Sequence, residues 1–344
     1  MDPLTHIVIG RAVVAAARDE SRNRVVGAAA ILGALSPDVD SALVFAGWDR
    51  YVRAHQFGTH SLLGALTMAM VTAVVVDRSA KASALRRSAK VLAERPPIAR
   101  LKASRSTLFL AAAAGALSHV ALDLLSGARI AIAWPLFNRR VSAPLVAMAD
   151  PWLIAVCLVW LAMLWPARIP LRRASRIAVA TAAIFLCAKA ALLGVAIDRS
   201  GVSPHEQSAF EARWGSLTTW YVFERLTDCV RASTIAANGG EGLVSFAHPL
   251  TMESPLVAAS RAVEDVRNFL AVHEFTFAEE TRNDDATASV VWSDIRYCWP
   301  AAGGATWRIA TNCGVRVGAV FAASGRAVTQ EIRIGGFMQR RPVS

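Results

Sequence analysis

The chain has 344 residues, of which 54% are hydrophobic and 18% are charged, and its mean hydropathy is +0.39. This length allows two domains, and the apolar excess argues against a wholly soluble protein. The formal net charge is +11, but the basic residues lie in and between apolar segments. That distribution fits the loops of a membrane protein better than a nucleic-acid surface. We therefore expect a lipid bilayer, and no nucleic acid, as a partner.

Residues 1–200 read as a membrane-embedded helix bundle. Two apolar helices are expected at 4–17 and 25–35, both shorter than the roughly 20 residues that cross a bilayer. Longer apolar segments follow at 62–76, 107–125, 152–165 and 177–197. We expect these four segments to cross a bacterial inner membrane, which makes the protein multi-pass.

Basic residues between the apolar segments predict the orientation. The expected loop 77–106 holds nine basic and two acidic residues, and the turn 166–176 holds four arginines. The positive-inside rule places both on the cytoplasmic side. The ends of the segments that carry histidine and aspartate then face outward, and so do residues 201–344, which would be periplasmic.

Residues 201–344 have a different character, and we expect a small, soluble, β-rich domain there. Alternating polar and apolar residues predict strands at 273–279, 287–299, 306–310, 315–322 and 327–334. One disulfide, Cys298–Cys313, is possible if this domain lies in an oxidising compartment. The fold class is therefore a mainly α membrane helix bundle followed by a small β-rich domain.

Histidine and aspartate residues recur at the mouths of the apolar segments and are candidate metal ligands. The set is His6, Asp38, Asp40, His55, His60, His119 and Asp123. His119 and Asp123 are four apart on a helix and share one face. Imidazole and carboxylate together suit zinc, and also manganese or iron. Each residue alone could equally be a hydrogen-bonded structural group, and the set could instead line an ion path.

Five short motifs occur in order: T-H (5–6), L-S-P-D-V-D (35–40), H-Q-F-G-T-H-S (55–61), S-H-V-A-L-D (118–123) and W-P-L (134–136). Over roughly residues 1–165 they resemble the bacterial inner-membrane-associated metal-dependent hydrolases. The central motif of that family usually reads H-R-G-x-T-H-S. Here Gln56 stands in place of the arginine and the glycine is shifted to Gly58, which weakens any inference of an arginine contact to substrate.

The H-x-x-x-D spacing is also similar, more distantly, to the zinc-dependent phospholipase C superfamily. That resemblance implies a cluster of one to three divalent ions, with zinc first, held by His119, Asp123, His60, Asp38 and His6. Asp40 and His55 would be further ligands or partners that orient the imidazoles.

These observations predict a membrane-bound hydrolase in which a metal-activated water attacks a phosphoester or a lipid-linked substrate. Asp40 is our first choice for the proton acceptor. Lys189, Arg139 and Arg140 could meet an anionic group of the substrate, or Lys189 could be a structural pairing and the arginines a plain interfacial pair. Asp150 could reach the site or cap the next helix. The alternative functions are a membrane-anchored binding module with a structural metal, and a metal-ion transporter.

Overall fold

The computed structural model describes residues 1–17, 23–46, 51, 58–91, 103–165, 169–200, 208–239, 244–249, 254–298, 313–334 and 337–343. Contacts divide the chain into two compact units. Unit 1 comprises Met1–Ser41, Gln56–Ala191 and Ala212–Leu217, and unit 2 comprises Ala42–His55, Leu192–Glu211 and Thr218–Ser344.

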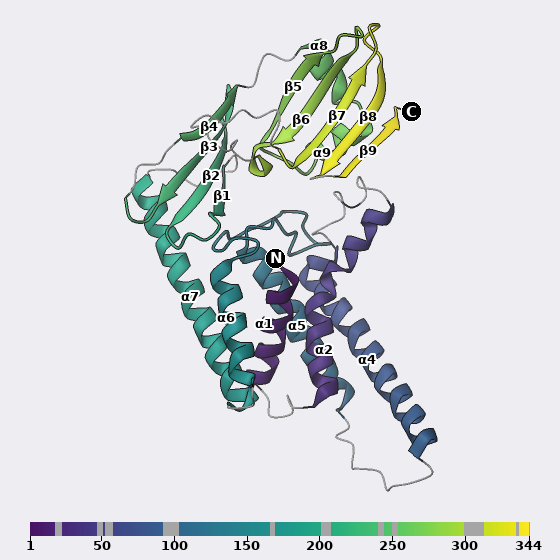
Figure 1. The fold of residues 1–344 in the computed structure, drawn as a ribbon, viewed down its shortest axis with the longest axis vertical. Coiled ribbons are helices and arrows are strands. Elements are labelled where there is room, and N and C mark those ends of the chain that lie inside the picture. Colours follow the sequence, from purple (N-terminus) through teal and green to yellow (C-terminus); the bar gives the residue numbers. More distant parts are fainter. Residues whose placement is uncertain are drawn as a thin grey trace. The chain divides into compact units, whose positions relative to one another are not determined.

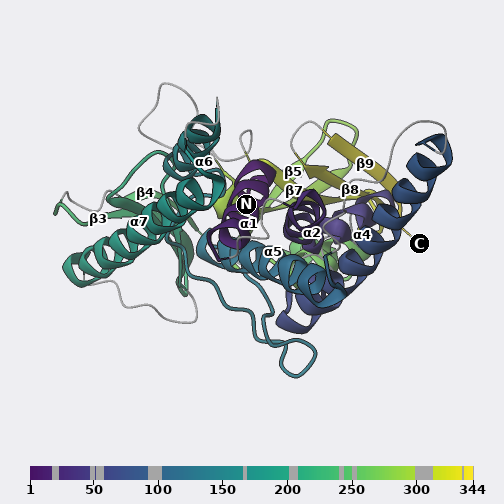
Figure 2. The same cartoon turned by 90° about the horizontal axis from the view of Figure 1, so that it is seen from below.

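The N-terminal part is helical, as the sequence predicts, and its helices lie side by side in Figures 1 and 2. The elements are α1 (Pro3–Ala17), α2 (Arg24–Leu35), η2 (Pro37–Ala46), η3 (Gly58–His60), α4 (Leu62–Val91), α5 (Arg105–Leu125), α6 (Pro151–Leu164) and α7 (Leu171–Ser200). Among the described residues, α5, α7 and the first 22 residues of α4 are long and apolar enough to cross a membrane. The pair α2 and η2, bent by 50°, counts as a fourth span if it is one broken helix.

Two sequence expectations for this bundle need correction. The helix α6, expected as a span over 152–165, has 14 residues and is too short to rank among the candidate spans. The expected loop 77–106 is helical up to Val91, and α5 already begins at Arg105. The basic stretch is rich in Ala, Arg, Lys and Leu, which favour helix. Asp77 also binds Lys81 one turn on, at 2.6 Å.

The helices α2 and α5 pack through small residues. A Cβ on Gly33 would lie 2.2 Å from the carbonyl oxygen of Ala112, and a Cβ on Gly115 would lie 2.2 Å from that of Ala30. Small side chains let helix backbones approach this closely in membranes. The approach brings the middle of α5 against the C-terminal end of α2.

A second apolar cluster joins α1, α6 and α7. Leu153 and Trp160 of α6 are buried in it, and the Trp160 indole donates to Ser175 Oγ at 3.0 Å. Asp150 begins α6 by accepting hydrogen bonds from the backbone N–H groups of Trp152 (3.0 Å) and Leu153 (3.2 Å). Of the two roles that the sequence left open for Asp150, the helix cap is confirmed.

Unit 2 is built on two sheets. The first has the order β1-β2-β3-β4 and the second the order β5-β6-β7-β8-β9. The elements are β1 (Ser208–Ala212), β2 (Thr219–Arg225), β3 (Cys229–Ala236), β4 (Val244–Pro249), α8 (Pro255–Ser260), α9 (Glu264–Leu270), β5 (Thr276–Arg282), β6 (Ala288–Asp294), η4 (Ile295–Tyr297), β7 (Val315–Phe321), β8 (Ala327–Ile334) and β9 (Phe337–Pro342). The mixed helical and β architecture expected from the sequence is confirmed.

The individual strand predictions fare differently. Those at 315–322 and 327–334 are confirmed as β7 and β8, and 273–279 corresponds to β5 displaced toward the C-terminus. The expected strand 287–299 ends at Asp294, because a 3₁₀ turn follows. The expected strand 306–310 lies outside the described residues.

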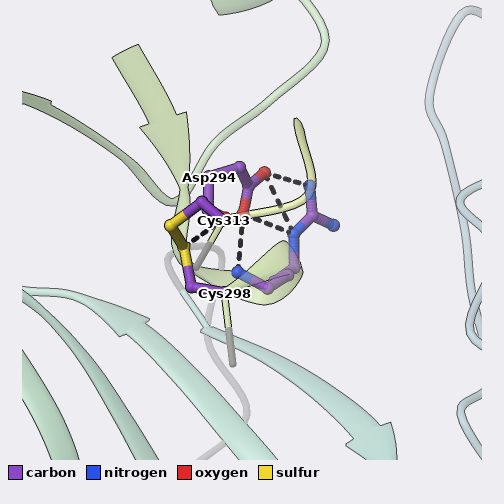
Figure 3. The surroundings of a disulfide bond; sticks show 4 residues. Asp294, Cys298 and Cys313 are labelled. Atoms are coloured by element: carbon purple, nitrogen blue, oxygen red, sulfur yellow. Dashed lines mark hydrogen bonds and ion pairs between the residues drawn. A yellow bond between two sulfur atoms is a disulfide. The ribbon is translucent and has the colours of Figure 1, made fainter. Parts of the chain in front are cut away.

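A disulfide joins Cys298 and Cys313 across the end of this turn, as Figure 3 shows. The bond is the one that the sequence allowed. Both cysteines are buried in a cluster with aromatic side chains of β2 and β5. Next to them the Asp294 carboxylate accepts from Arg296 (2.6 Å) and lies 2.9 Å from His273 Nδ1. Burial raises the pKa of the Asp294 carboxyl, but Arg296 and His273 overcome this effect and hold it below its usual range.

Candidate metal centre

Four side chains from three separate segments meet inside unit 1. They are Asp38 of η2, His60 of η3, and His119 and Asp123 of α5. Both histidines and Asp123 are buried. His60 Nε2 lies 3.3 Å from His119 Nε2, and both nitrogens lie 3.5 Å from Asp38 Oδ1. Asp123 Oδ2 is 3.4 Å from the first nitrogen and 3.2 Å from the second. This group could hold a metal ion.

The turn before α4 fixes the position of His60. Ser61 Oγ donates to the Gly58 carbonyl at 2.8 Å and accepts from Gly64 N–H at 3.0 Å. A Cβ on Gly64 would lie 1.7 Å from the Gly58 carbonyl oxygen, so only glycine fits there. The turn therefore holds His60 tightly at the N-terminus of the first long helix.

Both imidazoles have a partner at Nδ1, the ring nitrogen away from the converging atoms. His119 Nδ1 lies 2.7 Å from the Ala34 carbonyl, to which it can only donate. His60 Nδ1 lies 3.4 Å from Asp40 Oδ2, and Thr59 Oγ1 donates to that same oxygen at 2.9 Å. In both rings a partner meets Nδ1 while Nε2 lies among the converging atoms, the usual arrangement of a histidine ligand. Asp40 thus lies behind His60, on the side away from the four converging atoms.

Three carboxylates, those of Asp38, Asp40 and Asp123, lie within ion-pair distance of the imidazoles of the cluster. Burial lowers the pKa of His60, but hydrogen bonds to Asp123, Asp38 and Asp40 outweigh it and raise that pKa to about 11. Three carboxylates around two imidazoles favour a positive charge at their centre. Asp38 is the open side of the group, since its side chain is 34% exposed whereas both imidazoles are fully buried.

His6 of α1 lies against this group. Its ring stacks on His119 with 3.8 Å between centroids, and its Nε2 lies 3.2 Å from Asp123 Oδ1. Apart from this ion-pair contact, both ring nitrogens are buried without a hydrogen bond. The Met1 amino group also contacts Asp123 Oδ1. An unsatisfied buried imidazole is costly, so His6 is suited to complete the coordination of a cation.

The remaining candidates from the sequence lie elsewhere. Lys189 is 1% exposed, and its ammonium group donates to the carbonyls of Ser216 (3.1 Å) and Leu217 (3.3 Å). These contacts match the structural pairing that the sequence left open for Lys189. Arg139 is exposed and Arg140 is half-buried in the connector between α5 and α6. His55 lies outside the described residues.

Two supporting groups were not singled out from the sequence. Thr59 stands inside the H-Q-F-G-T-H-S motif, and its position between the histidines was the available signal. The Ala34 carbonyl is a backbone group, and no residue type in the sequence could reveal it. Both act by orienting an imidazole, which depends on tertiary packing.

Comparison with known proteins places the chain. A family model described as YdjM inner membrane protein matches residues 1–197. No curated protein and no solved structure matches the chain. The matched segment contains the four converging residues, His6 and the candidate spans except the last three residues of α7. The chain belongs to the YdjM inner membrane protein family.

Proposed function

We propose that the chain is a membrane-bound, metal-dependent hydrolase that cleaves a phosphoester bond in an amphiphilic or lipid-linked substrate. The observation that carries this proposal is the convergence of His60 Nε2, His119 Nε2 and one oxygen each of Asp38 and Asp123. Neutral imidazole and carboxylate are the ligand types of hydrolytic zinc, manganese and iron centres.

The spacing of the donor atoms suits a single ion. Five separations within the group lie between 3.2 and 3.5 Å, and all four atoms lie within 4.8 Å of one another. Four donors this close together can all bind one ion at the bond lengths of a zinc site. The buried His6, whose Nε2 lies 3.2 Å from Asp123 Oδ1, would supply a further donor if a second ion bound there.

The chain's own residues have separable tasks in this proposal. A bound divalent ion would supply Lewis acidity and lower the pKa of a bound water to about 7. Asp40 orients His60 from behind, so we assign it a positioning role in place of the proton transfer expected from the sequence. Asp38 is the partly exposed carboxylate of the group, and we assign it the proton exchange with water or substrate.

One observation favours a second candidate, in which the metal is structural. Four protein donors within 4.8 Å of one another would fill the coordination of a zinc ion, as in closed structural sites. Under this alternative the chain is a membrane-anchored binding module. The partial exposure of Asp38 supports the hydrolase instead, because one ligand faces solvent and can give way to water.

The test compares wild type with Asp123→Asn and with the matched control Asp77→Asn, which changes a carboxylate on α4 outside the cluster. Each protein is purified in detergent, its metal content is measured by elemental analysis, and phosphodiester hydrolysis is assayed with and without a chelator. We expect bound zinc and chelator-sensitive hydrolysis in wild type and in the control, and loss of both in Asp123→Asn.

The other outcomes separate the alternatives. If the wild type holds its full metal content but hydrolyses neither soluble nor lipid phosphodiesters, the binding module with a structural metal is the correct function and the hydrolase is refuted. Ion uptake into proteoliposomes that depends on Asp123 would indicate a transporter. A wild-type protein that binds no divalent metal would refute the proposal at its basis.

A further inference from the structure

The connector between α5 and α6 exposes a continuous run of large apolar side chains. Leu136 is 80% exposed, Phe137 is 68% exposed and Trp134 is 38% exposed. Together with the residues up to Arg140 they form the segment W-P-L-F-N-R-R, which we call the interfacial loop. Figure 2 shows part of this connector, in blue-teal, projecting beside α5. A soluble surface rarely leaves adjacent leucine and phenylalanine side chains exposed, unless they meet a partner.

The charge of the connector has a single sign. Residues 127–149 contain Arg129, Arg139 and Arg140 and no acidic residue. Arg139 is exposed and directly follows the apolar run. Cationic and aromatic side chains side by side are typical of segments that lie at the level of lipid headgroups.

The interfacial loop is tied to the ends of the membrane helices. The N–H of Leu62, the first residue of α4, donates to the Ile132 carbonyl at 3.0 Å. Ala143 N–H donates to the carbonyl of Leu124, at the end of α5, at 2.8 Å. A Cβ on Gly58 would lie 3.6 Å from the Trp134 ring, so the loop starts beside the turn that carries His60. These contacts fix the loop at the membrane face where the metal centre lies.

We propose that the interfacial loop inserts into the headgroup layer of the surrounding leaflet and binds an anionic phospholipid there. Leu136 and Phe137 lie among the upper acyl chains, and Arg139 binds the headgroup phosphate, with Arg140 adding to the positive potential. Charge complementarity and attachment to the ends of two candidate spans favour a lipid surface over a protein partner. The inference does not depend on catalysis at the metal centre, and its test uses no turnover.

The experiment measures where Trp134 lies and which lipid is next to it. Full-length protein is placed in nanodiscs of phosphatidylcholine mixed with phosphatidylglycerol, and one of the two lipids is brominated near the top of an acyl chain. The fluorescence difference between wild type and Trp134→Phe reports on Trp134 alone. We expect quenching by both lipids, and stronger quenching when phosphatidylglycerol carries the bromine.

The second arm adds Arg139→Ala and an internal reference. One arginine near an anionic membrane surface is worth about fivefold in affinity, so Arg139→Ala should remove most of the preference for phosphatidylglycerol. Trp165 is 83% exposed and ends α6 at the end opposite to Asp150. Its own difference signal, obtained with Trp165→Phe, should keep the same lipid preference in Arg139→Ala.

Two results would overturn the inference. Absence of quenching of the Trp134 signal by either lipid would mean that the loop lies in water or under a protein surface. Equal quenching by both lipids, unchanged in Arg139→Ala, would mean that the loop inserts without recognising an anionic headgroup. Metal content measured in parallel reports separately on the centre beside the loop.

Discussion

Replacing Gly33 by alanine tests whether close packing of α2 and α5 holds the candidate metal centre together. The added Cβ would lie 2.2 Å from the Ala112 carbonyl oxygen, whereas ordinary contact begins at 3.4 Å. The helices would therefore have to separate by about 1.2 Å, the difference between these values. The neighbouring Ala34 carbonyl would move with α2, and its 2.7 Å contact to His119 Nδ1 would lengthen beyond hydrogen-bond range.

The consequences can be measured separately. Overpacking of this size costs about 1–3 kcal/mol of stability, which should lower the melting temperature of the detergent-purified protein. Losing the partner that orients a ligand histidine typically weakens metal binding by about 10- to 100-fold. Competition with a chelator of known affinity gives the metal dissociation constant for both proteins.

Gly194→Ala is the matched control, since a Cβ at this position of α7 meets nothing within 4 Å. We expect it to leave metal binding unchanged and to stabilise the helix slightly, by about 0.5–1 kcal/mol. If Gly33→Ala binds metal as tightly as wild type and melts at the same temperature, the helices are not packed as closely as described. Metal binding would then not depend on the close packing of Gly33 against Ala112.

Three further outcomes are expected. Asp40→Asn should weaken metal binding about tenfold, because the imidazole of His60 loses its anionic partner; an unchanged dissociation constant in a chelator titration would contradict the positioning role. Burial raises the pKa of Glu211 from 4.5 to about 7, so the folded protein binds a proton at this carboxyl more tightly than the unfolded chain does. The stability gained from this binding is complete below pH 4.5 and is lost as the pH rises through 7. Thermal melts of Glu211→Gln should lack this loss, and parallel pH curves for both proteins would refute it. Replacing Cys298 and Cys313 by serine removes a cross-link between residues 15 apart, and should destabilise unit 2 by about 3 kcal/mol; a reductant should have the same effect on wild type and none on the variant, as scanning calorimetry can show.

The features that could be predicted from the sequence are those that depend on residues close together in the chain. The spacing of His119 and Asp123 places both on one helix face in any α-helix, and long apolar runs predict α5 and α7 directly. The alternating polar and apolar residues of β7 and β8 likewise predict these strands directly. The expectation failed at 77–91, where basic charge was read as a loop although the same residues favour helix.

Other features follow only from tertiary packing. The role of Asp40 depends on which side of the His60 ring it meets, and two neighbouring carboxylates of one turn, Asp38 and Asp40, face opposite ring nitrogens. The strands β1 to β4 were missed for another reason, because their alternation of polar and apolar residues is weak, although β2 and β3 pair as a local hairpin. Sequence spacing has no information on which ring nitrogen of His60 each carboxylate meets.

The distribution of the ligands along the chain has a consequence for biogenesis. Asp38 and His60 leave the ribosome well before His119 and Asp123, and α4 separates the two pairs. A cation that needs all four can be captured only after α5 has docked against α2. Metal loading would then be a late assembly step. The bound ion would stabilise the contact between the early and late parts of the bundle, and a chelator would remove that stabilisation.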